Sequence, residues 1–184
     1  MLGWLTGRGG RRDKSPITEW RKAWAAAVET PQAARLQELR HSLESLGSAG
    51  DDLEIEREMA DGLSDLVALD SRLRGGDVPV IQTGHRVAAS DVCHFSVPAS
   101  MPDDPAQPSG RLLWTNRRAL FAGGGHSVSI GWHRVGAVLR IDRDLLLVLG
   151  GAETAQRFRF NSYADALCGA AIARHLAPPR RQGS

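Results

Sequence analysis

Between residues 15 and 76 the apolar positions recur every three or four residues, which is the spacing of amphipathic helices. Ser15-Pro16 predicts the first helix start, because Ser is a favoured N-cap and Pro fits the first helical position. Breaks at Thr30-Pro31 and before Asp51-Asp52 divide the region into three predicted helices. Their apolar stripes are Ile17, Trp20, Trp24, Ala27 and Val28; Leu36, Leu39, Leu43 and Leu46; and Leu53, Met59, Leu63, Leu66, Val67 and Leu73. These stripes could pack within the chain or mediate self-association.

From Pro79 onward the apolar period changes to two, which is typical of strands. Val80–Ala88 is interpreted as a strand pair or a strand with a bulge. In the next stretch Cys93, Phe95 and Val97 are expected on one face of a strand. The Pro-containing stretch that follows, 100–109, is interpreted as a solvated loop.

The segment 110–123 predicts a β-hairpin. Two apolar runs, Leu112–Trp114 and Ala119–Phe121, flank the turn signal Thr115-Asn116-Arg117. Asn tolerates positive φ and bonds its own backbone, which suits a tight turn. A second turn is expected at Gly123-Gly124-Gly125. Further strands are predicted at Ser127–Trp132, Val135–Ile141, Leu145–Leu149 and Gln156–Phe160, followed by a helix capped by Asn161-Ser162.

The pattern Gly-x-Leu-x-x-Thr-Asn-x-Arg-x-x-Phe-x-Gly from Gly110 to Gly123, with small shifts in its apolar positions, resembles the bacterial pleckstrin-homology-like and GRAM-like group of domains. The Phe158-x-Phe160 strand and the closing helix extend the resemblance over residues 79–176. It implies a strongly bent sheet or partly open barrel plugged by the helix, no shared catalytic residues, and binding of proteins or lipid headgroups. The expected fold class is α+β, with N-terminal amphipathic helices before a small pleckstrin-homology-like β-barrel closed by a C-terminal helix.

This reading divides the chain into a flexible basic arm at 1–14, a helical region at 15–76, a pleckstrin-homology-like domain at 77–177 and a disordered tail at 178–184. The 184 residues carry a net charge of +2, and no apolar run is long enough to span a membrane. The start Met1–Thr6 is too short for a signal peptide, so a cytoplasmic location is expected. Cys93 and Cys168 are expected to be reduced, buried and structural.

Two candidate chemical sites have simpler explanations. Gly125-His126-Ser127-Val128-Ser129 departs from a nucleophile elbow, because its fifth residue is Ser and a strand follows it. The histidines at 85, 94, 126 and 133 and Cys93 lack the spacing of a metal site, because adjacent strand residues point to opposite faces. We therefore expect no enzyme activity, no metal and no cofactor.

Arginine carries the remaining functional hypothesis, because guanidinium groups suit phosphates. The candidate ligand-binding residues are Arg86, Arg117, Arg118 and Arg134, and the candidate membrane or partner contacts in the arm are Trp4, Arg8, Arg11 and Arg12. The small net charge disfavours nucleic acid as a partner. The sequence thus predicts a non-enzymatic protein-interaction or adaptor module that binds a protein partner or self-associates through its helical faces. The alternative is peripheral binding to anionic lipids at the inner face of the membrane, through the arm and these arginines.

Overall fold

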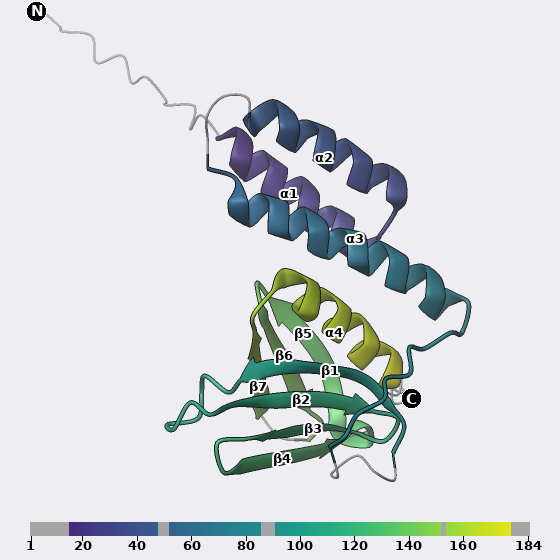
Figure 1. The fold of residues 1–184 in the computed structure, drawn as a ribbon, viewed down its shortest axis with the longest axis vertical. Coiled ribbons are helices and arrows are strands. Elements are labelled where there is room, and N and C mark those ends of the chain that lie inside the picture. The colour runs from purple at the N-terminus through teal and green to yellow at the C-terminus, as the bar shows by residue number, and fades with distance from the viewer. Residues whose placement is uncertain (1–14, 48–51, 86–90, 152–153, 178–184) are drawn as a thin grey trace, which may run out of the picture.

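The computed structural model describes residues 15–47, 52–85, 91–151 and 154–177. Three helices come first, and seven strands and a fourth helix follow (Figure 1). The helices are α1 (Pro16–Glu29), α2 (Ala33–Gly47), α3 (Glu54–Arg74) and α4 (Tyr163–Leu176). The strands are β1 (Cys93–Ser100), β2 (Ser109–Thr115), β3 (Arg118–Gly123), β4 (His126–Gly131), β5 (Val135–Ile141), β6 (Asp144–Leu149) and β7 (Ala155–Phe160), with a 3-10 turn, η2 (Trp132–Arg134), between β4 and β5. The α+β class and the sequence of helices, strands and closing helix agree with the prediction.

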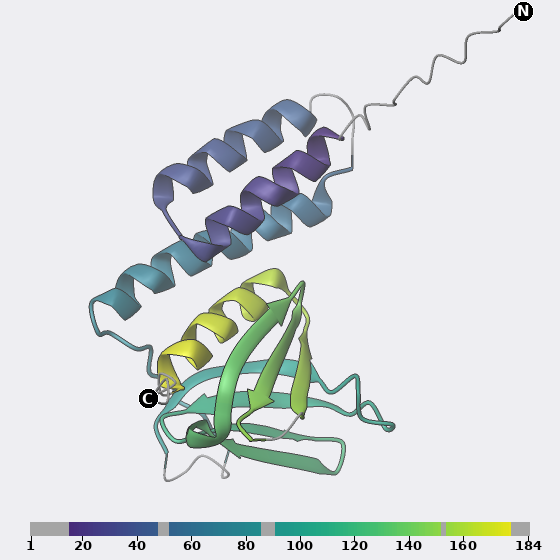
Figure 2. The ribbon, with the colours of Figure 1, turned by 180° about the vertical axis from the view of Figure 1, so that it is seen from behind.

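The strands form one antiparallel sheet in the order β4-β3-β2-β1-β7-β6-β5. The predicted hairpin is present, with Leu112 opposite Phe121 and Trp114 opposite Ala119. The sheet is curved (Figure 2), but it is not closed: over the described strands, no pairing joins β4 to β5. The expected bent sheet is therefore present, but closure of a barrel is not supported, and η2 connects the two edge strands β4 and β5 along the chain.

Helix α4 is the middle layer of the molecule. It lies between the sheet and α3 in both ribbon views (Figures 1 and 2). Tyr163 and Leu167 belong to the core of the three N-terminal helices, whereas Ala166 and Ile172 belong to the core of the sheet. A helix that is apolar on most of its circumference is expected to be buried on both sides. The helical region and the sheet therefore share α4 as a common wall.

The contact between α3 and α4 depends on a glycine. A Cβ atom on Gly62 would lie 2.9 Å from the backbone nitrogen of Ala164 and 3.1 Å from the carbonyl carbon of Tyr163. Side-chain carbons do not approach backbone atoms this closely, so only glycine permits the observed separation of the two helices.

Most residues of the predicted helical stripes are buried, and Ile17, Leu46, Val67 and Leu73 are partly buried, so the stripes pack within the chain. Trp20, Leu39 and Leu63 lie in a single core, and the indole of Trp24 donates a hydrogen bond of 2.7 Å to the carbonyl of Met59. The apolar faces of α1, α2 and α3 therefore contact one another within the same chain. The expectation of self-association through the helical faces is therefore not supported.

Three local predictions about the strands need correction. Residues 80–85 form no strand, although the amide of Ile81 donates to the carbonyl of Cys93 at 2.8 Å; the rest of the predicted Val80–Ala88 element lies outside the described residues. A β-bulge between Cys93 and Phe95 turns these two side chains to different faces, because it adds a residue to β1. The φ angle of Asn116 is not positive; its side chain instead accepts a hydrogen bond from the amide of Val92 at 3.1 Å.

Candidate functional site

Two of the predicted ligand-binding arginines are held by a buried carboxylate. The Arg118 Nε donates to Asp91 Oδ2 at 2.9 Å, and the Arg117 guanidinium lies 3.9 Å from the same carboxylate. Only 1% of the Asp91 side chain is exposed. Burial raises the pKa of Asp91, but hydrogen bonds from Arg118 and Thr115 outweigh it and place that pKa below its usual range. The Asp91 carboxylate therefore fastens the β2–β3 turn to the segment that precedes β1.

The other two predicted arginines have different surroundings. Arg134 lies on η2, at the end of the sheet where β3 begins, and its side chain is exposed. No hydrogen bond or ion pair is found for that side chain among the described residues. Arg86 lies outside the described residues, as do Trp4, Arg8, Arg11 and Arg12. The structure therefore brings Arg117, Arg118 and Arg134 to one end of the sheet, with only Arg134 free of an acidic partner.

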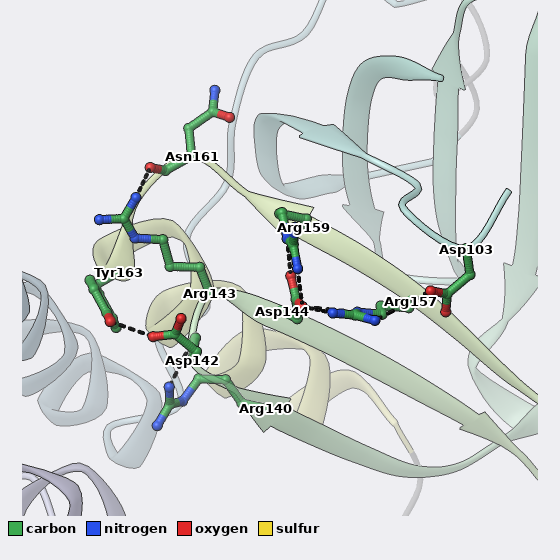
Figure 3. Close-up of polar contacts among 9 residues, drawn as sticks. All are labelled: Asp103, Arg140, Asp142, Arg143, Asp144, Arg157, Arg159, Asn161 and Tyr163. Carbon is green, nitrogen blue, oxygen red and sulfur yellow. Dashed lines mark hydrogen bonds and ion pairs between the residues drawn. The ribbon is translucent and has the colours of Figure 1, made fainter. Parts of the chain in front are cut away.

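A second buried carboxylate organises the outer face of β6 and β7 (Figure 3). Asp144 accepts hydrogen bonds from Arg159 Nε at 2.8 Å and from Arg157 Nε at 2.9 Å, and Asp103 pairs with Arg157 at 3.3 Å. The hydrogen bond from Arg159 lowers the pKa of Asp144 most strongly, while burial opposes it. The Phe-x-Phe alternation correctly predicted that Arg157 and Arg159 point away from the core, but their shared partner was missed.

A third polar group joins the helical region to the sheet. Glu58 on α3 pairs with Arg143 and accepts a hydrogen bond of 3.0 Å from the amide of Tyr163. Arg143 in turn lies over the Tyr163 ring, 4.8 Å from its centroid, and donates to the carbonyl of Asn161 at 3.2 Å. Figure 3 shows the Tyr163 hydroxyl directed at Asp142. Burial first, and then this hydrogen bond, raise the pKa of Tyr163 to about 12.

The outer face of β5 and β6 carries apolar side chains that no predicted site included. Val138 and Leu147 point into the core, so the residues that alternate with them point outward. Leu139 is 49% exposed and Ile141 is 63% exposed. We call this surface the outer patch; its members are Ala137, Leu139, Ile141, Leu146 and Val148. The signal in the sequence was Val138-Leu139-Arg140-Ile141, where apolar residues occupy both faces of one strand.

The side chains considered for catalysis or metal binding are dispersed. Ser127 and His126 are neighbours on β4 and therefore point to opposite faces; His126 Nδ1 lies 3.5 Å from Asp104. His94 Nδ1 contacts the carbonyl of Pro79 at 2.7 Å. In the part of the chain that the structure describes, no three potential metal-ligating side chains come together. Nor does any described helix have the length and apolar character needed to cross a bilayer.

Comparisons with known proteins do not identify a family for this chain. No protein-family model matches it, and no curated protein matches it. Among solved structures, it is similar to Inner Membrane Complex Sub-compartment Protein 1 from Toxoplasma gondii, with 12% identity, a TM-score of 0.42, and coverage of 62% of this chain and 91% of that one. Sub-compartment Protein 3 from the same organism gives 16% identity, a TM-score of 0.37, and coverage of 45% and 73%.

A structure of the Vav1 exchange factor, whose description names its PH and C1 domains, gives 11% identity and a TM-score of 0.40. This match covers 89% of this chain and 44% of the Vav1 structure. The chain therefore spans less than half of that structure. All three TM-scores are low. The fold is therefore described from the strands and helices of this chain and not from these matches. Neither the GRAM-like subgroup nor a bacterial origin gains support from these matches.

Proposed function

We propose that the chain is a non-enzymatic protein-interaction module that contacts a protein partner through the outer patch. The observation that carries this proposal is the exposure of Leu139 and Ile141 on the open edge strand β5, beside Leu146 on β6. Large apolar side chains gathered on an exposed sheet surface are typical of protein contact sites. A further role as an adaptor would need a second contact surface.

The energy available at the outer patch suits a specific contact. Full burial of a Leu or Ile side chain contributes about 1.5–3 kcal/mol, and roughly half of each of Leu139 and Ile141 is exposed. Each therefore offers about 1 kcal/mol to a partner. Arg157 and Arg159 flank the patch, but Asp144 already neutralises much of their charge. We infer that the partner presents an apolar surface rather than an acidic one.

Peripheral membrane binding is the alternative function, and the described residues give it less support. Arg117 and Arg118 already pair with Asp91. If they bound a lipid phosphate instead, the buried Asp91 carboxylate would lose these ion pairs. Arg117 and Arg134 are both exposed, but among the described members of the predicted set only Arg134 has no carboxylate partner. Membrane contact by Trp4 and the arm arginines stays a prediction.

The absence of catalysis is part of the proposal. The arrangement of Ser127 and His126 supports it, because two side chains on opposite faces of β4 cannot exchange a proton directly. The pKa values of Cys93 and Cys168 are both raised, chiefly by burial, which keeps these thiols poor nucleophiles.

Affinity capture from an extract of the source cells tests the proposal. The bait proteins are the full-length wild type, the double variant Leu139→Gln/Ile141→Thr, and the control Ile55→Gln. Ile55 lies on α3 and is 49% exposed, as Leu139 is, so it controls for the loss of an exposed apolar side chain elsewhere. All three baits are expected to have similar stability, because surface substitutions usually change it by about 0.5 kcal/mol or less.

We expect a protein that the wild type and Ile55→Gln retain and the double variant loses. Equal retention by all three baits would contradict a role for the outer patch. Sedimentation equilibrium of the same proteins checks whether the partner is a second copy of the chain. Pelleting with anionic vesicles that disappears at physiological salt and is unaffected by the double variant would favour the membrane alternative.

A further inference from the structure

A cleft of about 380 Å³ lies where the helical region meets α4 and β5. This volume falls within the range of small-molecule sites. Its apolar surface comes from α1, α3 and α4, through Val28, Leu66, Leu73, Leu167 and Ala171. Because α3 and α4 run side by side (Figures 1 and 2), the cleft is formed by both parts of the chain and by neither alone.

Three arginines line the cleft: Arg74 from α3, which pairs with Asp70, and Arg140 from β5 and Arg174 from α4. Arg140 lies over the Trp24 ring, 5.3 Å from its centroid, and its Nη1 donates to the carbonyl of Asp142 at 2.7 Å. Arg174 Nε donates to the carbonyl of Val138 at 3.4 Å. Each guanidinium is thus oriented by a backbone carbonyl, and each keeps further N–H donors available.

Arg140 and Arg174 differ from the arginines that pair with carboxylates elsewhere in the structure. Arg118, Arg143 and Arg159 each pair with a carboxylate. Within the described residues, no ion pair to a carboxylate is found for Arg140 or Arg174. Burial, and then the positive charge of Arg174, lower the pKa of Arg140. Arg140 and Arg174 are neighbouring cations, and Arg140 is half-buried. Holding both charges there without a counter-ion costs free energy, so the site favours a bound anion.

The other charges at the cleft leave room for that anion. Asp70 is already paired with Arg74 at 2.7 Å. Glu29 lines the cleft, and its negative charge raises the pKa of Arg140. Its side chain is exposed, and within the described residues it makes no hydrogen bond to Arg140. His175 lines the same space. An incoming anion would therefore compete with Glu29 at the cleft and with the Asp142 carboxylate, whose negative charge also acts on Arg140.

We propose that this cleft binds a small amphiphilic anion, with its carboxylate or phosphate group between Arg140 and Arg174 and its alkyl chain on the apolar surface. The guanidinium fork matches both headgroups. This site is separate from the outer patch, and the proposal does not rest on the proposed function.

Isothermal titration of the full-length protein with decanoate, decyl phosphate, inorganic phosphate and decyltrimethylammonium tests the proposal. We expect one equivalent of a decyl anion to bind, with the tighter of the two anions identifying the headgroup. Arg174→Gln removes an exposed guanidinium and should weaken this binding roughly tenfold, since hydrogen bonds to charged groups are the strong ones. Glu29→Gln should strengthen it several-fold by removing the competing carboxylate.

Arg72→Gln is the matched control, because Arg72 is an exposed arginine of α3 that pairs with Asp77 and does not line the cleft. It should bind the decyl anion as the wild type does. Absence of binding, equal binding of the decyl cation, or an unchanged affinity in Arg174→Gln would overturn the proposal. Inorganic phosphate binding as tightly as decyl phosphate would overturn the role of the apolar surface.

Discussion

The substitution Gly62→Ala tests whether the helical region is packed tightly on α4. The new methyl group would lie 2.9 Å from the Ala164 nitrogen and 3.1 Å from the Tyr163 carbonyl carbon. Both neighbours are backbone atoms of α4, so no side-chain rotation can relieve the contact. The two helices must move apart, and this also stretches the 3.0 Å hydrogen bond from the Tyr163 amide to Glu58.

The expected loss of stability follows from two opposing effects. Overpacking costs about 1–3 kcal/mol, and a contact with rigid backbone belongs at the upper end of that range. Alanine is favoured over glycine within a helix by about 1 kcal/mol. We therefore expect the free energy of unfolding to fall by about 2 kcal/mol, which corresponds to a drop in Tm of roughly 4–8 °C for a chain of this size.

Urea denaturation followed by circular dichroism measures this change, with Gly47→Ala as the control. A Cβ atom on Gly47 would lie 3.6 Å from Arg57 and 3.7 Å from Leu53, at ordinary contact distances. That variant should match the wild type or exceed its stability by up to about 1 kcal/mol. If Gly62→Ala were as stable as Gly47→Ala, the close packing of α3 on α4 would be wrong.

Four further predictions concern the titratable groups Asp144, Tyr163, Cys93 and Cys168. The pKa of Asp144 is lowered in the folded protein. Its ionised form therefore stabilises the fold above the ordinary pKa near 4, and this stabilisation is lost as the pH falls through the lowered pKa. In acid, the free energy of unfolding should therefore fall more for the wild type than for Asp144→Asn. Tyr163 is the single tyrosine of the chain, so phenolate absorbance should titrate near pH 12, and a midpoint near 10 would contradict its burial. The raised pKa of Tyr163 also means that its contribution to stability is present below pH 10 and lost as the pH rises through 12, an effect that Tyr163→Phe should remove. Cys93 and Cys168 should react slowly with a thiol reagent in the native protein and fast in urea, and fast native reaction would contradict their raised pKa values.

Periodicity predicted the parts of this fold that depend on local pattern. The stripes with Trp24 and Leu63, the hairpin around Thr115 and the alternation of Phe158 and Phe160 all follow from which side chains must be buried. The bulge after Cys93 does not follow from β1, because it is set by pairing with Thr115 and Trp114 on β2.

The candidate sites were harder to predict, because charge partners meet through the fold. Asp91 lies 27 residues from Arg118, and Glu58 lies 85 residues from Arg143. Neither spacing is a motif, so nothing in the sequence indicated that Arg118, a predicted ligand-binding residue, already has a carboxylate partner. The cleft with Arg140 and Arg174 could not be predicted either, because it requires α3 to lie against α4.

Photo-crosslinking from position 139 tests whether the outer patch contacts a protein in the cell. A photoreactive amino acid replaces Leu139 in one variant and Ser129, an exposed residue on the opposite edge strand β4, in another. Both variants are irradiated in the source cells. We expect a discrete protein adduct from position 139 and none from position 129. Adducts of the same pattern from both positions, or none from position 139, would contradict this expectation.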